Sequence, residues 1–151
     1  MEFRAYRADD FEAMFRLDEA CFEPQFRFSR AMMRRFAKAK KARIVIAEQD
    51  GLAGFCIVHV ERVDGGRVGY VMTLDVDAVW RGKGLAAELM RRAEAEAFEA
   101  GCVAMVLHVF VGNDVAIRFY ERAGYQQWTK AAGFYGKAGD AWVYRKLIVN
   151  T

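Results

Sequence analysis

A segment that joins a strand pattern to a helix pattern constrains this chain most. Residues 68–76 are rich in β-branched and aromatic side chains, which is typical of a strand. Residues 85–97 then place apolar side chains at helical spacing, with charged ones between them. The helix begins at the glycine-bearing turn 81–84. Such a turn directs free backbone N–H groups and the positive end of the helix dipole at one point. The segment therefore predicts an anion site, with a phosphate or pyrophosphate as the expected ligand.

Two other phosphate-binding motifs fit this loop less well. A P-loop is longer and ends in Gly-Lys followed by Ser or Thr, whereas Gly84 is followed by Leu85. The dinucleotide fingerprint is formally met by the glycines and alanine of residues 82–87. However, the polar loop 77–81 separates them from the strand, and the next strand pattern, 103–109, ends without a carboxylate. A dinucleotide site is kept only as an alternative.

The order of the element patterns predicts the fold class. With 151 residues, 54% of them hydrophobic, and a single proline, residues 1–151 are expected to form one domain. Strand patterns cover residues 3–6, 43–49, 52–60, 68–76, 103–109, 125–130 and 141–148, and helix patterns begin at Asp9 or Asp10, Ser29, Gly84 and Asn113. Hairpins followed by strand–helix–strand predict an α/β domain. We expect a mixed, mostly antiparallel sheet of about six to seven strands, flanked by about four helices.

Composition excludes several function classes. A net charge of +3 is too mild to indicate nucleic-acid binding, and the basic residues 34–43 are interpreted as a solvated helix face. The three cysteines, Cys21, Cys56 and Cys102, lack Cys-x-x-Cys spacing and are expected to be buried thiols of a reducing compartment. No metal site is expected from the two histidines. Without a signal-peptide or membrane-spanning pattern, the expected location is cytoplasmic, as a monomer or homodimer.

Several motifs in order resemble those of one enzyme family. Arg81-x-x-Gly84-x-Ala86, preceded by Leu74-Asp75-Val76, is similar to the coenzyme A loop of the GNAT superfamily of N-acetyltransferases. Residues 113–125, which read Asn-x-x-Ala-x-x-Phe-Tyr-Glu-x-x-Gly-Tyr, resemble the second signature of the family. Tyr135 followed by Asp140-Ala141 is similar to the closing stretch of protein N-terminal acetyltransferases. The resemblance covers nearly the whole chain.

This resemblance implies a binding site for acetyl-CoA. Backbone groups of Leu74 and Val76 would bind the pantetheine arm as an added strand. The pyrophosphate would lie against the loop formed by Arg81, Gly82, Lys83, Gly84, Leu85 and Ala86. Asn113 corresponds to an asparagine that contacts the cofactor, although the same side chain is a good N-cap for the helix that follows.

The resemblance also implies catalytic and acceptor residues. Tyr120 matches a tyrosine that protonates the departing thiolate, and its alternative role is that of a core aromatic. His108 stands where the related enzymes carry a glutamate proposed as general base; it is either the base here or a buried histidine satisfied by a carbonyl. Phe28 and Tyr135 are expected beside the acceptor amine. Gln25 departs from the family, which has an aromatic residue after this proline.

The expected function is therefore acetyl-CoA-dependent N-acetyl transfer. Direct attack by the amine is favoured, because no cysteine or serine in the matched motifs is placed as a nucleophile. A peptide or protein N-terminus is the leading acceptor. The alternatives are a small amine, such as an amino acid, polyamine or drug, and a non-catalytic acyl-CoA-binding module.

Overall fold

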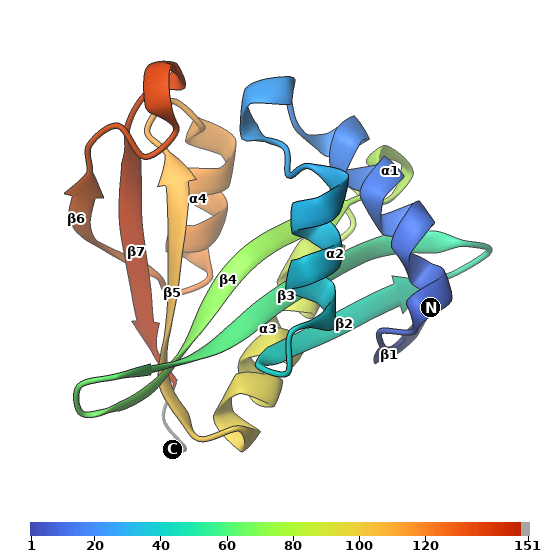
Figure 1. Ribbon diagram of the computed structural model, residues 1–151, viewed down its shortest axis with the longest axis horizontal. Helices are drawn as coiled ribbons and strands as arrows, with labels where there is room; N and C mark the ends of the chain where they lie inside the picture. The colour runs from blue at the N-terminus through green and yellow to red at the C-terminus, as the bar shows by residue number, and fades with distance from the viewer. Residues whose placement is uncertain (149–151) are drawn as a thin grey trace.

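The computed structural model describes residues 1–148, which form a seven-stranded sheet in the order β1-β2-β3-β4-β5-β7-β6 (Figure 1). The strands are β1 (Glu2–Ala5), β2 (Ala42–Glu48), β3 (Leu52–Val63), β4 (Gly66–Val76), β5 (Cys102–Phe110), β6 (Gln126–Ala131) and β7 (Ala141–Leu147). Within this described part, the α-helices are α1 (Phe11–Cys21), α2 (Arg30–Lys38), α3 (Leu85–Glu99) and α4 (Asp114–Arg122). Short 3₁₀ helices are η1 (Ala8–Asp10), η2 (Pro24–Phe26), η3 (Ala78–Trp80) and η4 (Gly136–Ala138). Only β4 and β5 pair in parallel among these strands, so the predicted mixed, mostly antiparallel sheet is confirmed.

Local chemistry explains where the elements begin and turn. Ser29 Oγ accepts the N–H of Met32 at 3.1 Å and so caps α2, as predicted. Asp50 and Gly51 take φ values of 53° and 113°, as a primed hairpin turn requires. Asp10 differs from the prediction, because its carboxylate does not cap α1. It accepts two bonds from the Arg4 guanidinium and one from the Arg7 N–H instead.

Helices cover both faces of the sheet. In Figure 1, α1 and α2 lie in front of β2–β4, and α3 lies behind them. The core on the α1/α2 side is built from Phe11, Met14, Leu17, Met33, Ile46, Phe55 and Ile57. The larger core on the other side includes Leu85, Leu89, Met90, Ala93 and Ala97 of α3, together with Tyr125 and Tyr144. Among residues 1–148, no helix has both the length and the apolar character needed to cross a membrane.

The two parallel strands diverge, and this divergence positions the site. Pairing between β4 and β5 ends at Tyr70 and Val106, although β4 continues to Val76 and β5 to Phe110. Figure 1 shows the strands spreading apart beyond that point. Residues 71–76 remain paired with β3 on their other edge. The edge of β4 that faces β5 therefore offers peptide groups to an extended ligand.

Candidate active site

The glycine loop before α3 has the geometry of an anion site. Gly82 and Gly84 adopt φ values of 73° and 83°, and a Cβ at either position would meet no atom within 4 Å. Within residues 1–148, the backbone N–H groups of residues 82–87 donate to no protein acceptor. These groups lie at the start of α3, where the helix dipole adds positive potential. The loop therefore fits the pyrophosphate that the sequence predicted.

Two cations of this loop behave differently. The guanidinium of Arg81 turns back to β4, where its Nε donates to the Val76 carbonyl at 3.2 Å. Lys83 stays exposed, with its Nζ 5.3 Å from the centre of the Trp80 ring. Arg81 thus anchors the loop to the sheet, and Lys83 is the side chain available to an anion.

The peptide groups of Leu74 and Val76 point toward the diverging edge. Asp77 N–H donates to Ala53 of β3 at 2.8 Å, and alternate residues of a strand turn their peptide groups to opposite edges. The Val76 carbonyl accepts from Arg81 and also from Cys21 Sγ at 3.5 Å. Of the two residues, Leu74 therefore has the freer carbonyl for an added strand.

Asn113 and Tyr120 lie at the start and in the last part of α4. Asn113 Oδ1 accepts the Ala116 N–H at 3.1 Å, so the N-cap role is confirmed. Tyr120 is half-buried and packs edge-on against Phe119 and Tyr125. Burial raises the pKa of its phenol, so Tyr120 keeps its proton near neutral pH and is chemically suited to donate it.

His108 forms a pair with Tyr70 across the divergence. The Tyr70 hydroxyl lies 2.6 Å from His108 Nδ1 and joins β4 to β5 at the point where their pairing ends. Burial lowers the pKa of His108, so the imidazole is neutral near pH 7. Burial raises the pKa of Tyr70, which keeps that phenol protonated. The pair therefore combines a neutral base with a hydroxyl that orients it.

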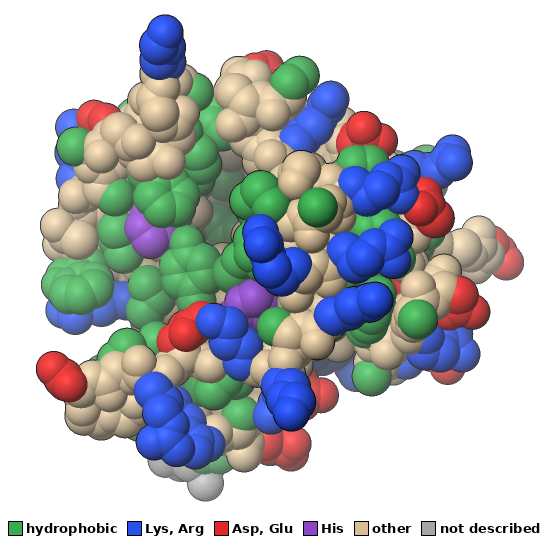
Figure 2. Space-filling view, viewed as in Figure 1, with side chains coloured by type: hydrophobic (Ala, Val, Ile, Leu, Met, Phe, Trp, Pro, Cys, Tyr) green, Lys and Arg blue, Asp and Glu red, His purple; other side chains and the backbone are tan. Residues whose placement is uncertain are grey.

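An aromatic cluster from three segments surrounds His108. Phe134 stacks on the imidazole with ring centres 3.9 Å apart. Tyr135 contacts Phe134 and meets Phe26 of η2 edge-on at 5.0 Å, and Phe26 also packs on Phe110 of β5. Figure 2 shows a hollow in this region, lined by hydrophobic side chains. The loop after α1 and the loop before β7 thus meet beside the histidine.

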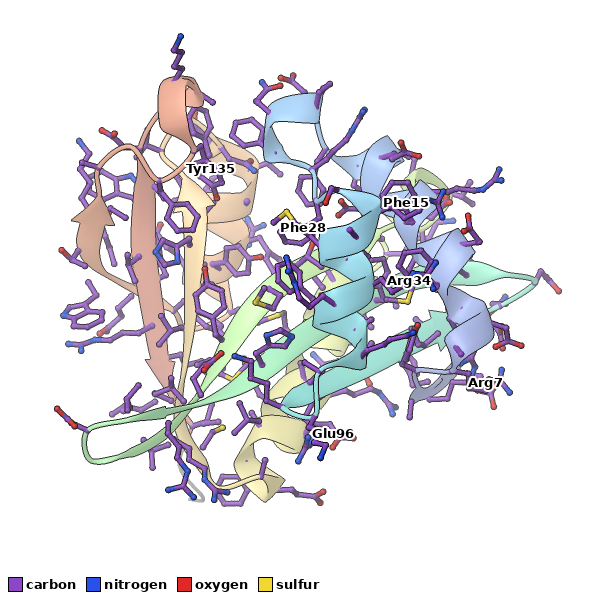
Figure 3. The ribbon with its side chains drawn as sticks, in the orientation of Figure 1. Arg7, Phe15, Phe28, Arg34, Glu96 and Tyr135 are labelled. Carbon is purple, nitrogen blue, oxygen red and sulfur yellow. The ribbon has the colours of Figure 1, made fainter. Side chains whose placement is uncertain are left out.

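The two predicted acceptor residues take different places. Figure 3 shows Tyr135 and Phe28 on opposite sides of the hollow. Tyr135 belongs to the aromatic cluster, whereas Phe28 is half-buried against Phe36 of α2 with ring centres 5.1 Å apart. The Phe28 N–H donates to Asp18 Oδ2 at 3.4 Å.

Asp18 is one half of a buried carboxyl pair. Asp18 and Asp75 are 1% and 0% exposed; Asp75 Oδ1 accepts from the Thr73 hydroxyl, and Asp75 Oδ2 has no hydrogen-bond partner among residues 1–148. Burial and then the neighbouring Asp18 raise the pKa of Asp75 well above its usual range. The protonated form of Asp75 is therefore favoured in the folded protein.

Sequence reasoning did not single out four residues near His108, which are Tyr70, Phe26, Phe110 and Phe134, although it expected the loops around residues 22–28 and Tyr135 to line the acceptor channel. Tyr70 lies in an obvious strand, but the pattern assigns it no partner. Phe26, which follows Gln25, places an aromatic ring against Phe110 and Tyr135. The available signal was the number of aromatic residues in the two loops, 22–28 and 132–140, which frame the hollow.

Comparisons with known proteins agree with this geometry. A model described as the acetyltransferase (GNAT) family matches residues 11–125. The fold is similar to ribosomal-protein-S18-alanine N-acetyltransferase from Escherichia coli, at 18% identity and a TM-score of 0.85, over 99% of this chain and 95% of that one. It is also similar to NAA60 of Arabidopsis thaliana in complex with acetyl-CoA, at 21% identity and a TM-score of 0.84, over 97% of this chain and 98% of that one. The fold is similar to nourseothricin acetyltransferase as well, at 21% identity and a TM-score of 0.79, over 98% of both chains.

Proposed function

The chain belongs to the GNAT family of acetyltransferases, so acetyl-CoA is its acetyl donor, and we propose that it acetylates the α-amine at the N-terminus of a polypeptide. The observation that carries the proposal is the Tyr70–His108 pair beside an aromatic hollow framed by two loops. A polypeptide end is neutral apart from its amine and can enter such a hollow in extended form. A polyamine would instead require acidic side chains along the hollow.

The chain's own groups suit the acetyl donor. The N–H groups of residues 82–87 and Lys83 would hold the pyrophosphate, and the open edge of β4 would hold the pantetheine arm. When bound, acetyl-CoA supplies a thioester carbonyl as electrophile and a thiolate as leaving group. None of the three cysteines is suited to an intermediate transfer, because burial raises the pKa of Cys21, Cys56 and Cys102 and keeps them as thiols. This supports direct attack by the acceptor amine.

In the proposed mechanism His108 removes a proton from the acceptor ammonium. The acting tautomer donates Nδ1–H to the Tyr70 oxygen, which leaves the Nε2 lone pair as base. Stacking on Phe134 fixes the plane of the ring. Because the pKa of His108 is lowered, the base is already neutral near pH 7 and is ready without prior deprotonation.

Tyr120 is proposed as the acid that protonates the departing sulfur. The raised pKa of Tyr120 keeps the phenol protonated until charge develops near it. A phenol of ordinary pKa ~10 is already a suitable donor to a thiolate, because the two acidities are close. Asn113 caps α4 and so holds the helix that carries this tyrosine.

The test is acetylation of a mixed library of short peptides and small amines, followed by mass spectrometry. Wild-type enzyme is expected to acetylate peptide α-amines, and His108→Gln is expected to lose most of this activity. His59→Gln is the matched control for loss of an imidazole, because His59 is buried against α2, where its Nε2 lies 2.9 Å from the Phe36 carbonyl. Products confined to small amines would move the assignment to that acceptor class. Tight CoA binding without any product would favour the non-catalytic module.

A further inference from the structure

The basic charge of this chain is concentrated in one stretch. Residues 27–43 hold eight of the 23 lysines and arginines and none of the 20 acidic residues. The remainder of the chain keeps 15 basic against 20 acidic side chains, so it is net negative. The net charge of +3 therefore conceals a strongly positive segment on an acidic protein. Such an asymmetry indicates a surface for an anionic partner.

Four of these eight charges lie on α2, and three of the four make no ion pair within residues 1–148. Arg30 pairs with Glu12 of α1, but Arg35 and Lys38 are exposed and make no ion pair within residues 1–148. Arg34 lies over the Phe11 ring at 4.0 Å. By contrast, α3 pairs both of its arginines with Glu88.

The dipole of α2 favours only part of this arrangement, because Arg35 and Lys38 lie in the last turn, where positive charge is stabilising. Arg30 is the first residue of α2 and no acidic residue stands in the first turn, although the helix dipole favours negative charge there. The positive charges along one short helix also repel each other. The dipole does not account for Arg30, and the exposure and mutual repulsion of the four cations indicate a role in binding.

The basic strip of α2, defined as Arg30, Arg34, Arg35 and Lys38, lies beside the aromatic hollow. These four residues and Ala31 line a surface depression along the helix. Phe36 of the same helix packs against Phe28, at the edge of the hollow. Figure 2 shows Lys and Arg side chains gathered over α2 next to the hollow. A chain whose first residue reaches His108 can therefore continue along α2.

We propose that the basic strip binds acidic side chains that follow the first residues of the acceptor polypeptide. This inference rests on the proposed function and names its preferred substrates. With nine residues, α2 is about 14 Å long and spans about four residues of extended chain. The acidic side chains are therefore expected near positions three to six of the acceptor.

Nucleic acid and membrane fit the strip less well. Single-stranded nucleic acid is held by exposed aromatic rings on which bases stack, whereas Phe28 and Phe36 are half-buried against each other. An interfacial membrane helix exposes a broad apolar face, whereas α2 exposes Met32 and Ala31 among its cations and buries Met33 and Ala37 in the fold. Carboxylates on a polypeptide match both the charge and the neighbouring hollow.

The experiment compares two acceptor peptides that differ only at positions three to six, which are Asp and Glu in one and Asn and Gln in the other. For the wild type at low salt, kcat/KM is expected to be ~10-fold higher for the acidic peptide, mainly through KM, and the difference is expected to shrink at high salt. The double variant Arg35→Glu/Lys38→Glu should lose this preference while it acetylates the neutral peptide normally. The control Arg62→Glu/Arg91→Glu carries the same charge change on exposed sites outside α2 and should keep the preference for the acidic peptide.

The outcomes separate the two proposals. Equal kcat/KM for both peptides with wild type, or an unchanged preference in the double variant, would overturn the basic strip as a substrate site. A third outcome is that the wild type binds an oligoribonucleotide in a salt-sensitive way, the double variant does not, and neither prefers the acidic peptide. This outcome would assign the strip to nucleic acid and overturn the proposed peptide site. No acetylation of either peptide would instead overturn the proposed function, and this inference with it.

Discussion

The buried pair Asp18–Asp75 gives a quantitative prediction about stability. In the native state the pair holds a proton, because burial and then Asp18 raise the pKa of Asp75. The unfolded chain releases this proton near the ordinary carboxyl pKa of ~3.9. Above that pH the native state binds one proton more than the unfolded state. The pair therefore lowers the free energy of unfolding by about 1.4 kcal/mol for each pH unit, up to the raised pKa of Asp75.

Asp75→Asn removes this proton linkage while it keeps the shape of the side chain. The amide oxygen of the asparagine can still accept from the Thr73 hydroxyl, as Asp75 Oδ1 does. The variant is therefore expected to gain stability over wild type by about 1.4 kcal/mol per pH unit as pH rises from 5. Asp18→Asn removes only the neighbouring charge, so part of the pH dependence should remain.

Urea unfolding followed by tryptophan fluorescence at pH 5, 6, 7 and 8 measures this difference. Asp64→Asn in the exposed β3–β4 turn is the control for loss of one carboxylate. Its free energy of unfolding should change with pH in the same way as that of the wild type. A difference between Asp75→Asn and wild type that stays constant with pH would refute the reasoning. It would mean that the native pair holds no extra proton.

Four further predictions concern the site. Gly84→Asp should abolish CoA binding in isothermal titration, because an acidic side chain at a positive φ opposes the pyrophosphate; unchanged affinity would contradict the loop assignment. Tyr120→Phe should lower kcat by ~100-fold with CoA affinity unchanged, and equal turnover would remove its acid role. The kcat/KM of wild type should rise with pH through the lowered pKa of His108, below the ordinary value of 6.5, and level off near neutrality. Tyr70→Phe removes the hydroxyl that contacts His108 and should shift the apparent pKa of this pH profile. An unchanged apparent pKa would mean that the hydroxyl does not influence the base.

Local patterns accounted for most of the elements. Ser29 and Asn113 were expected as caps, and both accept the N–H three residues later. Their chemistry needs only a few neighbouring residues, so sequence alone contains it. Asp10 shows the limit, because Arg4 and the Arg7 N–H compete for its carboxylate and draw it away from the α1 cap.

The chain's sequence alone determined the anion-binding turn at Gly82 and Gly84 and the family motifs, since each rests on residues close together in the chain. Only the tertiary structure decided which side chains share a site. Tyr70 and His108 are 38 positions apart, and they meet because β4 and β5 pair in parallel and separate at that level. Phe26 meets Tyr135 for a similar reason, since their loops lie at the same end of diverging strands. Strand order, register and divergence arise from packing both faces of one sheet, and no local pattern records them.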